Sequence, residues 1–142
     1  MNPMILNPCI NLSFDGQCEA AFTFYERCLN GKITGMLTWG DSPMAKDAPP
    51  EWSSKIVHAT LSLGNTRMLG ADATPGSYES PRGFDLLLSL DDAGETERLF
   101  SALAEGGTVR LPLQETFWAL RFGMLTDRFG IPWEFNCAKS ES

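Results

Sequence analysis

Two stretches of the chain, 76 residues apart, carry the same pattern of capping, apolar and glycine positions. Five positions of the first align without gaps with five of the second: Asp15, Glu19, Phe24, Gly31 and Ile33 with Asp91, Glu95, Phe100, Gly107 and Val109. Chance similarity between two capped helices is the alternative, and the matching order of strands around the helices argues against it. Half of a 142-residue chain buries little apolar surface by itself, so the two halves are expected to pair.

Apolar periodicity and turn residues predict one strand–helix–strand–strand–strand unit in each half. The first unit is expected to contain these elements: strand 5–13, helix 16–29, strand 32–39 and a hairpin across Gly64-Asn65. The second is expected to contain these: strand 84–90, a helix from 91–92 to about 105, strand 108–114 and a hairpin across the turn DRFG. Asp15 or Gly16 can cap the first helix, and Asp92 with Glu95 resembles a capping box for the second.

This order predicts an α+β fold in a single domain over residues 1–142. Module one covers about 5–72 and module two covers 84–138. The segment 73–83 between them contains two prolines and two glycines, which is typical of a linker.

Composition excludes several classes of partner. Eleven Lys and Arg residues against eighteen Asp and Glu residues give a net charge of −7, which argues against nucleic acids and anionic membranes. No apolar run approaches the roughly 20 residues of a membrane helix. The N-terminus MNPMILNPCINL lacks the features of a signal peptide, and the four cysteines form no CxxC pair. We therefore expect a cytoplasmic protein with reduced thiols.

The chain has one histidine, His58, which limits the chemistry open to it. Metal sites that need two or three histidines from one chain are excluded. His58 can act as a general base, because an unperturbed imidazole has a pKa near 6.5, or it can be a hydrogen-bonded wall residue. Its candidate partners are the carboxylates of Asp41 and Glu115, both at loop positions.

Alternation along the strands divides the side chains into two faces. In KIVHATLSLG, Val57, Ala59, Leu61 and Leu63 should lie under the helix, and Ile56, His58, Thr60 and Ser62 should face the other way. The same rule assigns this further set to the second face: Cys9, Asn11, Ser13, Asp85, Leu87, Ser89, Glu134 and Asn136. A face this polar is typical of a ligand cavity, although the polar groups could instead bond across the sheet. Trp133, with the opposite parity, is expected in the core.

Four segments resemble one protein family: FDGQCEAAFTFYERCLNGKI, PPEWSSKIVHATLSLG, MLGADATPG and PLQETFWALRFGMLTDRFGIPWEFNC. They are similar to the PhnB/YjdN-like subfamily of the vicinal oxygen chelate superfamily, the glyoxalase and bleomycin resistance fold. The resemblance implies two βαβββ modules whose four-stranded sheets form a cupped mixed sheet around a cavity, and a homodimer. A methyltransferase label used in this family finds no support here, because the chain has no GxGxG loop for S-adenosylmethionine.

The resemblance also indicates where metal-dependent members of the superfamily hold their metal. Glu134 stands at the position of their final glutamate, Asp85 at that of their fifth-strand histidine, and Cys9 at that of their first-strand histidine. The fourth-strand glutamate has no counterpart, and Asp72 is the nearest carboxylate. A divalent ion on Cys9, Asp85 and Glu134 is chemically possible, but this unusual donor set favours a site without metal or other cofactor.

Aromatic residues near the predicted cavity allow two interpretations each. Gln114 and Trp118 can line the cavity mouth, or their segment can plug the cup or form a dimer contact. Trp39 and Trp52, which flank the Pro-rich loop, can form a lid or simply anchor the loop. The predicted ligand-binding set comprises Asn11, Thr60, Asp85, Gln114, Trp118 and Glu134, and the candidate catalytic residues are His58 and Glu134.

Three functions are compatible with these features. The first is binding of a small molecule in the cup. The second is a metal-dependent lyase or isomerase reaction of the vicinal oxygen chelate type, with Glu134 as the base. The third is a dimeric interaction module whose cavity is filled by Trp118 and Phe122. We expect the first.

Overall fold

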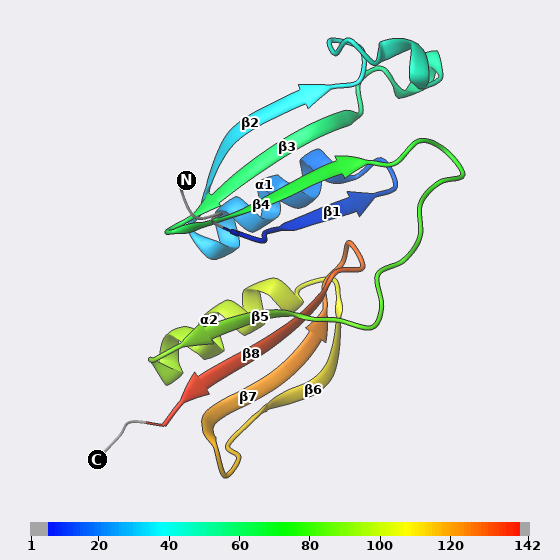
Figure 1. Cartoon of the computed structure of the whole chain (residues 1–142). Coiled ribbons are helices and arrows are strands. Elements are labelled where there is room, and N and C mark those ends of the chain that lie inside the picture. The colour runs from blue at the N-terminus through cyan, green and yellow to red at the C-terminus, as the bar shows by residue number, and fades with distance from the viewer. Residues whose placement is uncertain (1–5, 140–142) are drawn as a thin grey trace. The chain divides into compact units, whose positions relative to one another are not determined.

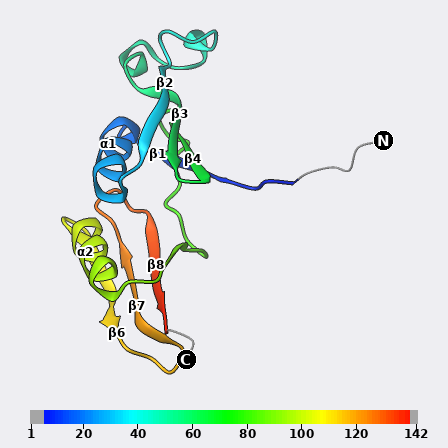
Figure 2. The same ribbon diagram turned by 90° about the vertical axis from the view of Figure 1, so that its left-hand side faces the viewer.

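The computed structural model describes residues 6–139, which form two compact units (Figure 1). Unit 1 extends to Tyr78, and unit 2 begins at Glu79. Each unit contains one four-stranded mixed sheet and one long helix, as the internal repeat predicts. Figure 2 shows that each helix covers a single face of the sheet of its own unit. We call the other face the open face of that unit.

Unit 1 has the strand order β1-β4-β3-β2, with β1 parallel to β4 and the other pairs antiparallel. Its elements are β1 (Ile10–Phe14), α1 (Cys18–Leu29), β2 (Lys32–Thr38), β3 (Ile56–Leu63) and β4 (Thr66–Asp72), with short 3₁₀ turns at Ala45–Asp47 and Pro50–Trp52. The core lies between α1 and the sheet. It contains Phe14, Phe22, Tyr25 and Leu61, none of them more than 1% exposed.

Unit 2 repeats this topology with the order β5-β8-β7-β6, in which β5 is parallel to β8. Its elements are β5 (Leu86–Leu90), α2 (Ala93–Ala104), β6 (Thr108–Gln114), β7 (Ala119–Thr126) and β8 (Pro132–Ala138). Leu103, Leu125 and Phe135 are fully buried between α2 and the sheet. The repeat and the α+β class are therefore confirmed, whereas the prediction that the two sheets cup a cavity stays a prediction.

Two predicted strands begin later in the structure than the sequence pattern suggests. The strand expected over 5–13 is β1, which starts at Ile10; residue 5 lies outside the described part of the chain. Pro8 explains the difference, because a proline has no N–H for a strand ladder. The strand expected from residue 84 is β5, which begins at Leu86.

The start of α1 differs from the prediction that Asp15 or Gly16 caps this helix. The helix begins at Cys18, and no side chain next to it in sequence caps it. Instead, the backbone N–H of Cys18 donates to Oδ1 of Asp72, at 2.9 Å, and the N–H of Ile56 donates to Oδ2, at 2.8 Å. Asp72 is 1% exposed. A carboxylate 54 residues away thus accepts a hydrogen bond from an N–H group at the start of the helix, and it links α1 to β3 and β4.

Helix α2 is capped locally, as predicted. The Asp92 carboxylate accepts a hydrogen bond from the N–H of Glu95, at 2.7 Å. The Glu95 carboxylate accepts from Nε of Arg98, at 2.9 Å, on the exposed surface. In a complete capping box the Glu95 carboxylate would also accept a hydrogen bond from the N–H of Asp92. Among the hydrogen bonds of these two side chains, only the bond that Asp92 accepts belongs to the box.

Both tryptophans that flank the Pro-rich loop of unit 1 are hydrogen-bonded to the end of β4. Nε1 of Trp39 donates to the carbonyl of Asp72, and Nε1 of Trp52 donates to the carbonyl of Ala73, each at 3.1 Å. Trp39 is also buried. These contacts support the interpretation that the tryptophans anchor the loop.

All four cysteines lie in the described part of the chain as free thiols. Cys9 is exposed, and the other three are buried. Burial, with smaller contributions from the charges of Asp72 and Glu19, raises the pKa of the Cys18 thiol to about 12. Among residues 6–139, no helix has the length and apolar character needed to cross a bilayer.

Candidate functional site

The open face of unit 1 carries most of the polar side chains that strand parity predicts there. In β1, Asn11 and Ser13 are exposed, while Leu12 and Phe14 are buried. In β3, His58 is exposed. Ile56 is the exception: it was expected on the open face and is only 2% exposed. A register shift between Leu37 and Thr38 interrupts the β2–β3 pairing beside it, so strict alternation does not extend to Ile56.

The contacts of His58 are few. Its Nε2 lies 3.4 Å from Oγ1 of Thr60, two residues along the same strand face. Among residues 6–139, His58 forms no ion pair with Asp41, its predicted partner in unit 1. Glu115, the other predicted partner, belongs to unit 2, where its carboxylate lies 3.8 Å from Nζ of Lys139. The pairing of His58 with Glu115 stays a prediction.

A groove of about 550 Å³ adjoins the open face of unit 1. Cys9 and Thr60 line it, together with Thr34, Ser62 and Arg67. Asn11 lies on the same face but outside the groove. The lining is mostly hydroxyl groups and short loop residues, so it offers hydrogen bonds to a ligand.

The open face of unit 2 is more apolar and holds most of the predicted ligand-binding residues. Glu134 of β8 pairs in register with Leu87 of β5 and Met124 of β7. Leu87 is 56% exposed. Among the described residues, the Glu134 carboxylate has no ion-pair partner within 4 Å. Glu134 is thus a negative charge placed between two apolar side chains.

An aromatic cluster lies next to Asn136 in the same sheet. Nε1 of Trp118 donates to Oδ1 of Asn136, at 3.0 Å, which fixes the orientation of both groups. The Trp118 ring meets the rings of Phe117 and Phe122 edge to face, with centroid distances of 4.7 and 5.1 Å. Trp118 is still 45% exposed. Phe122 pairs in register with both Asn136 and Gln114.

Gln114 does not bond to this aromatic cluster. Its Nε2 donates to the carbonyl of Pro112 on its own strand, at 3.3 Å. Gln114 therefore borders the cluster through its register with Phe122. Trp133 is 1% exposed, and its Nε1 donates to Asp127, so its predicted core position is confirmed.

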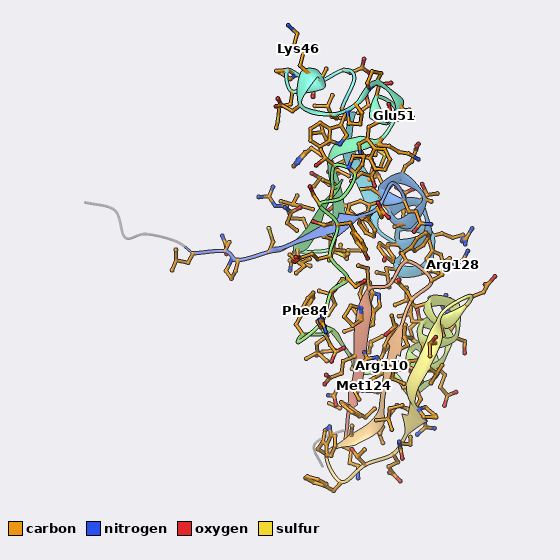
Figure 3. All side chains as sticks on the ribbon, turned by 90° about the vertical axis from the view of Figure 1, so that its right-hand side faces the viewer. Lys46, Glu51, Phe84, Arg110, Met124 and Arg128 are labelled. Atoms are coloured by element: carbon orange, nitrogen blue, oxygen red, sulfur yellow. The ribbon has the colours of Figure 1, made fainter. Side chains whose placement is uncertain are left out.

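The sequence pattern did not reveal the ion pair between Asp85 and Arg110. Nη2 of Arg110 lies 2.5 Å from Oδ1 of Asp85, and the same nitrogen donates to the carbonyls of Leu125 and Trp133, at 3.0 and 3.4 Å. Figure 3 shows Arg110 beside Met124 on the sheet of unit 2. Alternation along the predicted strand 108–114 places Arg110 on the same face as Gln114, but it names no partner for the guanidinium.

The proposed metal donors are divided between the units. Cys9 belongs to unit 1, whereas Asp85 and Glu134 belong to unit 2. Over residues 6–139, no three His, Cys, Asp or Glu side chains are grouped so that they could hold a metal. The two carboxylates of unit 2 fit a divalent ion poorly, because Arg110 already neutralises Asp85. We therefore derive no chemical step through a metal.

The comparisons with known proteins agree with this architecture. Residues 8–135 match the Glyoxalase/Bleomycin resistance protein/Dioxygenase superfamily, and the chain belongs to this superfamily. Protein YjdN of Escherichia coli K12 is 34% identical over 138 residues, which cover 92% of this chain and 94% of YjdN.

Two solved structures extend the comparison. Protein PA1353 from Pseudomonas aeruginosa is 44% identical, has a TM-score of 0.87, and the match covers 96% of this chain and all of that one. A Bacillus cereus protein described as a putative 3-demethylubiquinone-9 3-methyltransferase, PhnB protein, shares the fold with a TM-score of 0.79 at 21% identity, over 94% of this chain and all of that one. The predicted relationship to YjdN is thus confirmed, and the Bacillus cereus structure shows the same fold.

Proposed function

We propose that this chain binds a small organic molecule on the open face of unit 2. The observation that carries the proposal is the half-exposed Trp118 ring, held in place by its bond to Asn136 and by two aromatic neighbours. A ring whose orientation is already fixed loses little conformational entropy when a ligand stacks on it. Flat apolar walls with a few fixed polar groups are typical of ligand sites.

The polar groups around Trp118 supply specificity in this proposal. Asn136 keeps its amide nitrogen for a ligand, because the Trp118 indole uses its oxygen. Glu134 adds an unpaired carboxylate in the neighbouring register row. Leu87 and Met124 on either side of Glu134 would exclude water from a bound ligand.

Trp118→Ala tests the proposal with the neutral fluorescent probe N-phenyl-1-naphthylamine. An aromatic pair contributes about 0.5–1.5 kcal/mol beyond area burial, so we expect Kd to rise by up to about tenfold. Met44→Ala is the matched control, because Met44 is 48% exposed in a loop of unit 1. Equal affinity of the Trp118→Ala variant and the Met44→Ala variant would contradict a site at Trp118.

A metal-dependent lyase or isomerase is the second candidate function. The observation in its favour is Glu134, a carboxylate on the open face without an ion-pair partner among the described residues, which could act as a base. It requires a third donor beyond Asp85 and Glu134 and the displacement of Arg110 from Asp85. A native mass spectrum after addition of zinc, nickel or manganese distinguishes the two: a stoichiometric ion favours the lyase or isomerase.

The same spectrum tests the predicted homodimer. The expectation of a homodimer comes from the family resemblance. A monomer mass at micromolar concentration would argue against it.

A further inference from the structure

Arg110 is fixed by one of its nitrogen atoms. Nη2 meets the Asp85 carboxylate and the carbonyls of Leu125 and Trp133, and it thereby connects β6 with the start of β5 and with β7 and β8. The side chain remains 35% exposed. A guanidinium held in this way has already lost much of the rotamer freedom that binding would otherwise cost.

The other nitrogens of Arg110 keep their donors. Within the described residues, Nε has no acceptor, and Nη1 has only the sulfur of Met124, at 4.0 Å, which is a weak acceptor. An arginine carries five N–H donors, so the framework uses only those of Nη2. The remaining donors can bind an oxygen ligand.

Arg110 lines a groove of about 400 Å³ in unit 2. Arg82 lines the same groove, is exposed and forms no ion pair within residues 6–139, and Phe84 provides an apolar wall. Figure 3 shows Phe84 and Arg110 in this part of the unit. Two guanidinium groups thus stand against the single carboxylate of Asp85, which Arg110 already binds.

Two carboxylates near the groove oppose an anion. Glu134 is not part of the groove lining and forms no ion pair with Arg110 among the described residues. Glu79 is also outside the lining, but it borders a neighbouring groove that Arg82 and Phe84 line as well. The lining itself therefore has an excess of one positive charge. At short range, charge-assisted hydrogen bonds to fixed donors outweigh a more distant like charge that solvent screens.

We propose that Arg110 and Arg82 form an oxyanion site, and that the ligand of this chain carries a carboxylate or a phosphate group. Arg110 supplies the fixed donors, and Arg82 adds a mobile positive charge across the groove. The inference names the ligand class for the face proposed above, and in that sense rests on it. It needs no metal, because the positive charge at Asp85 comes from the chain itself.

Titrations with sodium acetate and with inorganic phosphate, followed by ¹H–¹⁵N NMR, test the site. Sodium chloride at matched ionic strength corrects for screening, and tetramethylammonium chloride tests whether the groove prefers a cation. We expect saturable shifts of the Arg110 Nε–H signal and of the Asp85 and Thr126 amides. A carboxylate ligand predicts tighter binding of acetate, and a phosphate ligand predicts tighter binding of phosphate.

Three variants separate the site from general charge effects. Arg110→Gln and Arg82→Gln should each weaken anion binding by about tenfold, which corresponds to about 1.4 kcal/mol. Arg121→Gln is the matched control, because Arg121 is 34% exposed and pairs with Glu97 in the same unit. Arg82 has no ion pair to lose among residues 6–139, so its variant remains informative even if Arg110→Gln fails to fold.

The outcomes distinguish this inference from the proposed function. Shifts no larger than those with chloride, unchanged binding in the Arg82→Gln variant, or preferential binding of tetramethylammonium would overturn the oxyanion site. If the neutral naphthylamine probe still binds through Trp118, the proposed function survives that result. If the anions bind at Arg110 and the neutral probe does not bind, the oxyanion site stands and the Trp118 proposal fails.

Discussion

Asp72→Ala should cost this protein a large share of its folding free energy. The Asp72 side chain accepts two backbone hydrogen bonds in the core of unit 1, from Cys18 at the start of α1 and from Ile56 at the start of β3. Alanine leaves both N–H groups without an acceptor in a site that is 1% exposed. Hydrogen bonds to charged groups contribute about 1.5–3 kcal/mol each, so we expect a loss of about 4 kcal/mol.

Asp92→Ala provides the comparison, because Asp92 caps α2 by an equivalent bond on the exposed surface. A lost cap of this kind costs about 1 kcal/mol. Asp72→Asn should fall between the two, since the amide keeps one acceptor oxygen and loses the charge. The difference between the two alanine variants reports the burial of the Asp72 carboxylate together with its second hydrogen bond.

Urea unfolding, followed by far-ultraviolet circular dichroism and tryptophan fluorescence, measures these losses. Total stabilities of about 5–15 kcal/mol leave room to resolve the difference. If Asp72→Ala cost no more than Asp92→Ala, with an unchanged urea dependence, the conclusion that Asp72 holds α1 against β3 would be wrong.

The remaining predictions concern thiols and glycines. In the native protein a thiol reagent should label Cys9 alone, and after denaturation it should label all four cysteines. The pKa of Cys18 is raised to about 12, so its contribution to stability is fully present below pH 9 and is lost as pH rises toward 12. Cys18→Ala should therefore make the free energy of unfolding depend less on pH between pH 9 and 12. Gly70→Ala should destabilise by about 1–3 kcal/mol, since its Cβ would lie 2.7 Å from the Phe22 ring. Gly94→Ala should instead stabilise α2 by about 0.5 kcal/mol, because its Cβ would meet nothing closer than 3.5 Å. Thermal unfolding measures both changes. If the two substitutions changed the stability in the same direction, the argument from these contacts would be wrong.

The local elements of this fold could be predicted because their causes lie close together in the sequence. Asp92 caps α2 through a residue three positions away, and the β3–β4 hairpin turns at Gly64 and Asn65 as expected. The repeat at an offset of 76 residues predicted that both units would share one topology. Alternation along β1 and β8 correctly separated the core face, which includes Trp133, from the open face.

The site could be predicted only as a set of residues on a face. Parity placed Glu134, Asn136 and Asp85 together, but it carries no information about which side chains bond to one another. The Trp118–Asn136 bond joins residues 18 positions apart, and it depends on how the segment before β7 returns to β8. His58 shows the same limit, because Asp41, its predicted partner in unit 1, forms no ion pair with it among residues 6–139.

Contacts between distant residues changed the interpretation of two carboxylates. Only the tertiary structure determines which distant side chains and backbone groups meet. From the sequence, Asp72 was only the carboxylate nearest to a metal-ligand position that has no counterpart here, whereas in the structure it caps a helix that begins 54 residues earlier. Asp85 looked like a metal ligand, yet it binds Arg110, 25 residues later. The sequence by itself determined secondary structure, faces and family, because these follow from periodicity and local bonds. The partners of its buried and half-buried charges were decided by the tertiary fold, because only the folded sheets bring such distant residues within hydrogen-bond distance.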